Sequence, residues 1–363
     1  EKLDIHNHTE VNITMKMEAI FKEDSWKHIA HQKNRIIVWQ HYMISALFSP
    51  IFKEIKKRLK MILHPKVIYT DGYTPAQLSN IIRSQKGANY LFEDDLSKQD
   101  RQTDKETLKV EMGLYELLGM DKNLVQFWSS VHDKWKFKTR YASAYLSEMR
   151  HSGAPTTAIG NLITNLQVHK NFVKTHWGII KIILMLGDDN AILFSKSPAL
   201  KAHIKEAKHK YNMLVKPKVE TDAITYCGMM IYRTMGDRYE LGPDFYRLKY
   251  RFEATNGVSD GTYENLLARV MSYCMMVGKT KEIDEVINKL GLPVKPEEWY
   301  DFNSCVRGNM YHMKTTEADV IDTYVSLITE MSLVNRITKE FLVFTNETKH
   351  NSNRAEHARW KQK

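Results

Sequence analysis

The sequence predicts an α+β protein with a mixed helix-and-strand centre and a mostly helical C-terminal third. The composition, with 43% hydrophobic and 26% charged residues over 363 positions, is that of a globular chain and is too apolar for disorder. The centre alternates short apolar runs with amphipathic segments, whereas the last third shows mainly helical spacing. A chain of this length can bury a substantial core, so we expect these elements to pack into layers.

The first ninety residues are rich in Lys, Arg and His and contain two apolar segments, around Ile36–Trp39 and Ile44–Phe52. A basic run follows at helical spacing, formed by Lys53, Lys56, Lys57, Arg58 and Lys60. Such a run is usually the solvated face of a helix. It also suits a polyanionic partner, as does the formal net charge of +10, although charge concerns partners and not the fold.

The centre of the chain alternates strand and helix patterns. Tyr90–Phe92 is strand-like and leads into an acidic turn, and Lys105–Leu118 then has amphipathic helical spacing that ends at Gly119. Turn-forming residues at Ser152–Pro155 precede a helical pattern that runs through Phe172. This alternation predicts helices packed against a sheet.

Two apolar runs, Ile179–Leu186 and Ala191–Phe194, flank Gly187–Asn190 and predict a hairpin. The tail after Asn346 is polar, and we expect it to be frayed. The remaining predicted elements are one strand at Tyr226–Tyr232 and helices at Ala199–Met213, Thr262–Leu290 and Glu317–Leu342.

Cysteine and histidine usage argues against several kinds of site. The three cysteines lie far apart without CxxC spacing, which disfavours a disulfide framework or a zinc site. The fifteen histidines are scattered without ligand spacing, and we expect His203 and His209 at the surface. No apolar run approaches the roughly 20 residues of a membrane span. Because the chain begins at Glu1 rather than Met, we expect it to be a piece of a larger polypeptide.

Two acidic sites lie at the ends of apolar strands. The first is Glu93–Asp104, which includes Asp95, and the second is the pair Asp188 and Asp189 between two apolar runs. Carboxylates that project from strand ends into one cleft can hold hard cations. Two magnesium ions close together can activate an attacking hydroxyl and stabilise a leaving pyrophosphate. Taken singly, each pattern is more often a plain turn or a helix cap.

A third stretch, Ser152 to Asn161, supports a functional role for the two acidic sites. Its small residues open a loop, and Thr157 and Asn161, four residues apart, fall on one face of the helix that follows. A hydroxyl and an amide on one face could contact a ribose 2′-OH, which both donates and accepts hydrogen bonds. Alone, this face would be expected merely to meet water.

These three stretches, in this order, resemble the palm motifs of RNA-dependent RNA polymerases of positive-strand RNA viruses, most closely the alphavirus-like supergroup. The first family motif has an Asp, another five residues later and often a third four beyond. The second runs Ser-Gly, three variable positions, Thr, three more and Asn, and the third is Gly-Asp-Asp-Asn. The matching residues are Asp95, Asp100 and Asp104, then Ser152, Gly153, Thr157 and Asn161, then Gly187–Asn190.

Weaker resemblances flank these motifs. Lys216 stands where the family has a lysine proposed to protonate pyrophosphate, with Lys218 as a nearby competitor. Tyr226–Met229 resembles the primer-grip hairpin, and Lys33–Ile37 resembles the basic fingers motif that contacts the triphosphate. The sequence around Asp95 and Lys33 is most similar to that of endornavirus polymerases.

The resemblance implies a right-hand polymerase fold, with a palm of antiparallel sheet plus helices, fingers and a mostly helical thumb. We expect partial fingers at 1–89, the palm at 90–235 with an interleaved fingers segment at about 120–150, the thumb at 236–345 and a polar tail at 346–363. Few residues precede Lys33, so the fingers are expected to be incomplete. The thumb assignment depends only on position and helical pattern.

The resemblance also implies a role for each matched residue. Asp95 and Asp188 would hold Mg²⁺, for which Mn²⁺ can substitute, with Asp189 assisting and Lys216 as the acid. The basic run would follow template phosphates. The nucleotide-binding residues would be Lys33 and Arg35 on the triphosphate, Asp100 and Asn161 on the ribose, Ser152, Gly153 and Thr157 in the adjusting loop, and Asn190 behind the carboxylates.

The partners implied are an RNA template with its nascent strand, nucleoside triphosphates and other regions of a viral polyprotein or replicase. We expect the host cytoplasm, in a replication complex that can be membrane-associated. A reverse transcriptase is the nearest rival, but Gly187 before Asp188 and the presence of Asn161 favour RNA synthesis. The intact Asp95 and Asp188 disfavour a non-catalytic RNA-binding module, and a structural or signalling protein leaves the ordered motifs unexplained.

Overall fold

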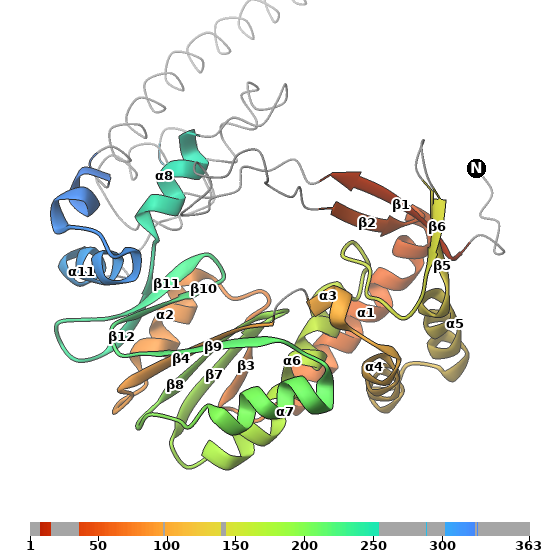
Figure 1. Cartoon of the computed structure of the whole chain (residues 1–363), viewed down its shortest axis with the longest axis horizontal. Coiled ribbons are helices and arrows are strands. Elements are labelled where there is room, and N and C mark those ends of the chain that lie inside the picture. The colour runs from red at the N-terminus through yellow and green to blue at the C-terminus, as the bar shows by residue number, and fades with distance from the viewer. Residues whose placement is uncertain are drawn as a thin grey trace, which may run out of the picture.

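The computed structural model describes residues 8–15, 36–96, 99–138, 143–253, 288, 302–323 and 325, which form a mixed α/β fold (Figure 1). Strands of the described part make three sheets rich in antiparallel pairs. The predicted mixture of helices and strands in the centre is therefore confirmed. No helix within the described ranges is both long enough and apolar enough to cross a membrane.

A five-stranded sheet lies at the centre in the order β3-β7-β8-β4-β9. β3 runs parallel to β7, whereas the β7–β8, β8–β4 and β4–β9 pairs are antiparallel. The first strand, β3, precedes residue 89, so part of the region expected to be fingers contributes to this sheet. The five strands are β3 (Val67–Tyr69), β4 (Tyr90–Leu96), β7 (Ile180–Leu186), β8 (Asp189–Phe194) and β9 (Val215–Glu220).

The two faces of this sheet bury two different cores, because successive strand residues point to opposite sides. Phe92 and Ile192 pack on the side of α1 and α6. Leu91 and Leu193 pack on the other side, against α2 and the small sheet β10-β11-β12. The covering elements are α1 (Tyr42–Ile62), α2 (Pro75–Arg83), α6 (Thr157–His176), α7 (Lys201–Tyr211), β10 (Ala223–Tyr226), β11 (Met229–Arg233) and β12 (Tyr239–Gly242).

Local sequence explains why two of these helices form. In α1 the buried residues recur every three or four positions, at Ile44, Phe48, Phe52, Ile55 and Leu59, so one stripe faces the core. α2 begins with a capping box in which the hydroxyl of its N-cap threonine accepts from a backbone N–H and the glutamine three residues later bonds back. The apolar stripe therefore explains which face of α1 is buried, and the capping box explains where α2 begins.

A second sheet, β2-β1-β5-β6, joins segments that are far apart in the sequence. β1 pairs with β2 antiparallel and with β5 parallel. Figure 1 shows this sheet beside α5, away from the central sheet. The elements of this region are β1 (Glu10–Met15), β2 (Ile36–Gln40), α3 (Gln99–Gln102), α4 (Lys105–Leu117), α5 (Lys122–Asp133), β5 (Trp135–Lys138) and β6 (Ser143–Leu146).

The C-terminal described residues are helical and pack on the small sheet. α8 (Phe245–Glu253) and α11 (Phe302–Met313) contribute Phe245, Cys305 and Val306 to a third apolar cluster with β11. Residues 317–323 are also helical, which agrees with the start of the helix predicted at Glu317–Leu342. The rest of that helix, nearly all of the one predicted at Thr262–Leu290 and the tail after 346 lie outside the described residues.

Most predicted elements of the centre are confirmed, and one is wrong. The helix predicted at Lys105–Leu118 matches α4, and Gly119 ends it with a φ of +91°. Tyr226–Tyr232 is not one strand but a hairpin, because Cys227 and Gly228 both have positive φ and reverse the chain between β10 and β11. That hairpin is what the primer-grip resemblance predicted.

Candidate active site

Strand β4 places neighbouring carboxylates on opposite faces of the central sheet. The Glu93 carboxylate accepts from the backbone N–H of Thr225 at 2.8 Å, on the side of the small sheet. Asp94 is buried on the side of α6 and α7, and Asp95 is exposed. Alternation along a strand puts Asp95 on the same face as Glu93. Asp95 is therefore accessible where the strand ends, as the sequence predicted.

The β7–β8 hairpin brings the second acidic site to the same end of the sheet. Leu186 pairs with Asp189, so Gly187 and Asp188 alone form the loop. Gly187 has a φ of +61°, which a two-residue turn with glycine first requires. The predicted loop, Gly187–Asn190, was two residues too long, because the last two residues are already paired in β8.

The carboxylates influence one another electrostatically. Although solvent reaches Asp189, protein surrounds most of the group, and this burial raises its pKa. The charges of Asp188 and Asp95 raise it further, and the pKa reaches about 6 despite the opposing effects of Cys227 and Arg247. Three carboxylates, two on strands and one in the turn between β7 and β8, thus share one region with excess negative charge.

Lys216 lies directly opposite Asp95 in the β4–β9 pair. Residues opposite one another on adjacent strands project to the same side of a sheet. Lys216 is exposed, whereas Lys218 forms ion pairs with Glu93 at 3.8 Å and with Glu220 at 3.5 Å. Of the two lysines considered, Lys216 is the one placed next to the exposed carboxylate.

Two buried amides connect the acidic sites from below. Asn190 donates from Nδ2 to the backbone carbonyl of Asp94 at 3.1 Å and to Oδ1 of Asn165 at 3.3 Å. Asn165, on α6, donates in turn to the backbone carbonyls of Gly187 at 3.3 Å and Asp188 at 3.1 Å. These bonds fix the turn that carries Asp188 relative to β4. Sequence reasoning found Asn190 but missed Asn165, whose amide gives no local signal.

The third predicted stretch contacts the first through a side-chain pair. Asn161, on α6, donates from Nδ2 to Oδ1 of Asp100 at 3.1 Å. Oδ1 of Asn161 is buried and has no hydrogen-bond partner among the described residues. The Thr157 hydroxyl instead lies 2.7 Å from the carbonyl oxygen of His151 and 2.9 Å from that of Ala154, and its one hydrogen is shared between them. Asn161 and Asp100 therefore come together as predicted, while the Thr157 hydroxyl braces the loop.

The loop before α6 is fixed to β2. The backbone N–H of Val38 donates to the Ser152 hydroxyl at 3.0 Å, and the N–H of Gly153 donates to the Val38 carbonyl at 2.8 Å. A Cβ on Gly153 would lie 2.7 Å from that carbonyl oxygen, so only glycine fits. Lys33 and Arg35, which precede β2 in sequence, lie outside the described residues.

A buried ion pair, which no local pattern in the sequence indicated, supports the same loop. Arg150 bonds Glu111 at 2.6 Å, and the backbone N–H of Arg150 donates to the Asp100 carbonyl at 3.2 Å. Burial alone would raise the pKa of Glu111, but the guanidinium outweighs it and lowers that pKa below its ordinary value. A Cβ on Gly160 would collide with the guanidinium, which explains a glycine within α6.

The basic run lies on α1, with four of its five side chains exposed and Lys56 half-buried. Several of its charges are already paired within the chain. Lys56 contacts Asp71 at 3.0 Å, and Arg58 contacts Glu54 at 3.2 Å. The predicted helical spacing is confirmed, and the face is only partly available to other anions.

The histidine predictions were half right. His209 is exposed, but His203 is buried and bonds Asp94 together with His169. The two histidines come from different helices, so no spacing in the sequence could pair them. Within the described ranges, the ligand atoms of Asp94, His169 and His203 lie within 4.8 Å of one another and could together hold a metal ion. The exposed carboxylates of the described residues do not form such a group.

Comparison with known proteins gives a consistent set of similarities. A family model described as RNA dependent RNA polymerase matches residues 3–278. The chain is 28% identical over 197 residues to the replicase polyprotein 1ab of beet yellows virus, covering 52% of this chain and 6% of that protein. It is 24% identical over 251 residues to the replicase large subunit of potato mop-top virus, covering 66% and 13%. It is 26% identical over 197 residues to the non-structural polyprotein pORF1 of hepatitis E virus genotype 1, covering 54% and 11%. The match thus spans only a small part of each relative's length.

Proposed function

The chain belongs to the RNA-dependent RNA polymerase family, and on that premise we propose that it catalyses template-directed nucleotidyl transfer for a viral replicase. The attacking group would be the 3′-OH of a primer or nascent RNA, and the leaving group would be pyrophosphate. The observation that carries the proposal is that Asp95 lies near Asp188 and Asp189, at the β7–β8 turn, at one end of the central sheet and beside Lys216.

The exposed carboxylates fit divalent cations. Asp95, Asp188 and Asp189 offer hard oxygen ligands, which suit Mg²⁺ and Mn²⁺. Burial is the main cause of the raised pKa of Asp189, and the charges of Asp188 and Asp95 raise it further; bound cations would relieve this repulsion. When bound, two such ions supply activation of the attacking hydroxyl and charge neutralisation on the leaving pyrophosphate. Mutual repulsion among the three carboxylates supports their assignment as ligands of a cation. The identity of that ion is part of the proposal.

Other residues of the chain would bind and orient the substrates. Lys216, exposed opposite Asp95, would donate a proton to the leaving pyrophosphate. Oδ1 of Asn161 has no hydrogen-bond partner among the described residues, and its amide is bonded to the Asp100 carboxylate, so this pair of side chains would recognise a ribose 2′-OH. Ser152 and Gly153 would set the position of the nucleotide-side loop through their bonds to β2.

We propose that the central sheet with α1, α6 and α7 is the palm, and that β2-β1-β5-β6 is part of the fingers. The parallel pairing of β1 with β5, which joins the β1–β2 and β5–β6 pairs into one sheet, supports the interleaved fingers segment. The helices after residue 236 would form the thumb. Lys33 and Arg35 would neutralise the triphosphate, and Lys53 with Lys57 on α1 would contact template phosphates.

The partners proposed are an RNA template, nucleoside triphosphates and the other regions of a viral polyprotein. The relatives' names, which are those of replicases and polyproteins, support that context. From the family resemblance alone we also propose a location in the host cytoplasm, within a replication complex that can be membrane-associated.

The test is RNA-templated primer extension with labelled ribonucleotides and Mg²⁺, comparing the wild-type chain with Asp188→Ala. Asp222→Ala is the matched control, because Asp222 is an exposed aspartate in another turn, between β9 and β10. We expect wild type and control to extend the primer, and Asp188→Ala to fail.

Each outcome decides between the functions considered. Extension that prefers deoxyribonucleotides would identify a reverse transcriptase instead. Equal extension by wild type and Asp188→Ala would exclude Asp188 as a required ligand. RNA binding without extension, even when upstream fingers sequence is added back, would leave a non-catalytic RNA-binding module.

A further inference from the structure

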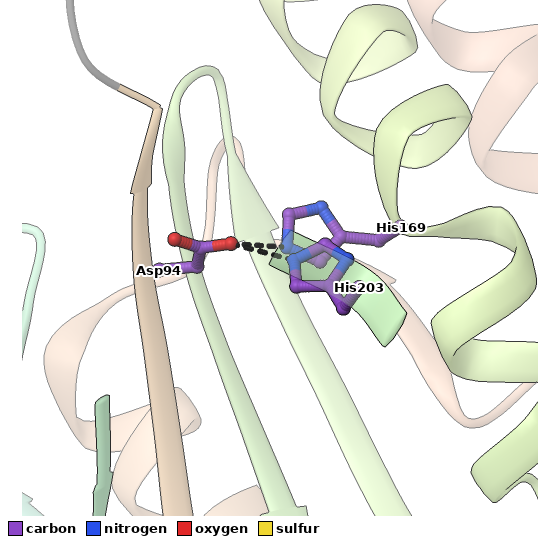
Figure 2. A group of neighbouring side chains, drawn as sticks. All are labelled: Asp94, His169 and His203. Atoms are coloured by element: carbon purple, nitrogen blue, oxygen red, sulfur yellow. Dashed lines mark hydrogen bonds and ion pairs between the residues drawn. The ribbon is translucent and has the colours of Figure 1, made fainter. Parts of the chain in front are cut away.

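The buried cluster of Asp94, His169 and His203 lies on the face of β4 opposite the exposed carboxylates (Figure 2). Oδ2 of Asp94 lies 3.1 Å from Nε2 of His169 and 2.8 Å from Nε2 of His203. All three side chains are excluded from solvent. They come from β4, α6 and α7, so the cluster connects three elements of the central layer.

The hydrogen bonds of His169 restrict what can lie between its Nε2 and Oδ2 of Asp94. Nδ1 of His169 is 2.9 Å from the carbonyl oxygen of Asn165, and a carbonyl can only accept, so Nδ1 carries a hydrogen. In a neutral imidazole the other nitrogen, Nε2, then presents a lone pair. A proton or a metal cation must therefore lie between Nε2 of His169 and the Asp94 carboxylate oxygen, because two acceptors in contact otherwise repel one another.

We propose that Asp94, His169 and His203 form a buried binding site for a transition-metal ion, with Zn²⁺ as the best-suited ion. Two imidazoles and one carboxylate are a ligand set that zinc uses and that Mg²⁺ does not favour. The inference does not depend on the polymerase activity, because these residues lie on the face away from Asp95 and Asp189.

The distances are close to those that such an ion needs. Ligand atoms about 2.0–2.1 Å from a tetrahedral zinc ion lie about 3.4 Å from one another. The observed carboxylate–imidazole separations of 2.8 and 3.1 Å are within about 0.6 Å of that value, and all three ligand atoms lie within 4.8 Å of one another. Nδ1 of His203 has no hydrogen-bond partner among the described residues, so no second bond opposes a small rotation of this ring.

The surrounding bonds orient two of the three proposed ligands, His169 and Asp94. Metal-binding histidines usually donate their other N–H to a carbonyl or carboxylate, as His169 donates to Asn165. The carboxylate is oriented too, because Oδ1 of Asp94 accepts from the backbone N–H of Lys216 at 2.9 Å. A fourth position would be filled by water or by that second carboxylate oxygen.

A bound ion would hold the elements that carry the exposed carboxylates. Asp94 precedes Asp95 in β4, and Asn165, which accepts from His169, also bonds the Asp188 carbonyl. The ion would thus stabilise the framework of the sheet without touching RNA or nucleotide. We assign it a structural role for this reason.

The test measures zinc in the chain produced with Zn²⁺ in the growth medium and purified without chelator. All proteins carry Asp188→Asn, so that the exposed carboxylates compete less for the ion. We expect about one zinc ion per chain in this background and in the control His209→Gln, and a loss of at least about tenfold in His203→Gln. His209 is the matched control because it is an exposed histidine of the same helix.

A second measurement covers the case in which His203→Gln does not fold. The chain with intact histidines is refolded with Co²⁺, and its visible absorption is recorded. Strong absorption typical of tetrahedral nitrogen and oxygen ligands supports the site. Absence of both zinc and this absorption, or equal zinc in His203→Gln and His209→Gln, would overturn it and leave an Asp–His hydrogen-bonded cluster stabilised by a proton.

Discussion

Asp94 and Asp95 are neighbours in the chain but lie in opposite surroundings. Asp95 is exposed with Asp188 and Asp189 nearby, on a face where negative charges repel one another. Asp94 is buried, where desolvation alone would raise its pKa, yet the hydrogen bonds from His169 and His203 lower that pKa below its ordinary value. One face thus brings several carboxylates together, and the other surrounds a single carboxylate with hydrogen-bond partners.

The contrast shows that one strand can present a side chain for the reaction on one face and a stabilising side chain on the other. Because side chains alternate along β4, the residue before Asp95 must face the opposite layer, where only a compensated carboxylate is tolerated. Asn165 and Asn190 link the two faces through backbone carbonyls. Substitutions on the exposed face should therefore change activity, and substitutions on the buried face should change stability.

The largest effect is expected for Asp95→Asn, which keeps the shape of the side chain and removes its charge. We expect primer extension to slow by about 1000-fold or more, as when a preorganised charged group is lost from a reacting centre. The melting temperature should stay near that of wild type, because Asp95 is exposed. A variant that extends primers at the wild-type rate would contradict the assignment of Asp95.

Asp94→Asn should behave in the opposite way. Removing one partner of a buried charged cluster leaves the others uncompensated, and we expect a loss of about 3 kcal/mol in the free energy of unfolding. Urea denaturation measures this loss, with Asp222→Asn as the exposed control. Unchanged stability combined with a loss of activity as large as that of Asp95→Asn would mean that Asp94 acts at the site itself.

Two other buried histidines sharpen the contrast, because neither makes a side-chain bond to a carboxylate as His169 and His203 do. Burial lowers the pKa of His151 to about 3, and the charges of His132 and Arg150 add to the effect. Its ordinary pKa is 6.5, so between these values the unfolded chain binds more protons than the folded one. The stability from neutral His151 is therefore complete above pH 6.5 and is lost as the pH falls towards 3.

At about pH 5 we expect the buried His151 to lower the free energy of unfolding by about 2 kcal/mol relative to neutral pH. Urea denaturation at several pH values measures the loss in wild type and in His151→Phe, which keeps a ring packed against Trp135. The variant should lose less stability on acidification, although His132, whose pKa burial also lowers, keeps part of the dependence. Identical pH dependence in both proteins would count against the buried neutral state of His151.

The smallest effect is expected at the ribose side of the exposed site. Asn161→Ala removes the amide that orients Asp100, and we expect the preference for ribonucleotides over deoxyribonucleotides to fall by about tenfold, or about 1.4 kcal/mol. Competitive incorporation of the two nucleotide types measures the preference. Asn171→Ala, on the same helix but bonded to Glu206, should leave it unchanged. An equal change in both variants would indicate a general disturbance of α6.

The sequence by itself determined the features that depend on neighbours in the chain. Asp95 and Asp100 five residues apart, Thr157 and Asn161 four apart on one helix face, and the turn at Gly187 all follow from local geometry. The strand ends and most central helices followed from apolar spacing in the same way. The order of the motifs then pointed to the family, which the family model confirms.

Only the tertiary structure decided which distant residues meet. Asp94 lies 75 residues from His169 and 109 from His203, and no local spacing links residues on three separate elements. The same is true of Asn165 under the Asp188 turn. Burial was equally invisible, because His203 and His209 are alike in the sequence and differ only in which face of α7 packs on the sheet. Contacts between elements depend on how the layers close, and that depends on the whole core rather than on any one segment.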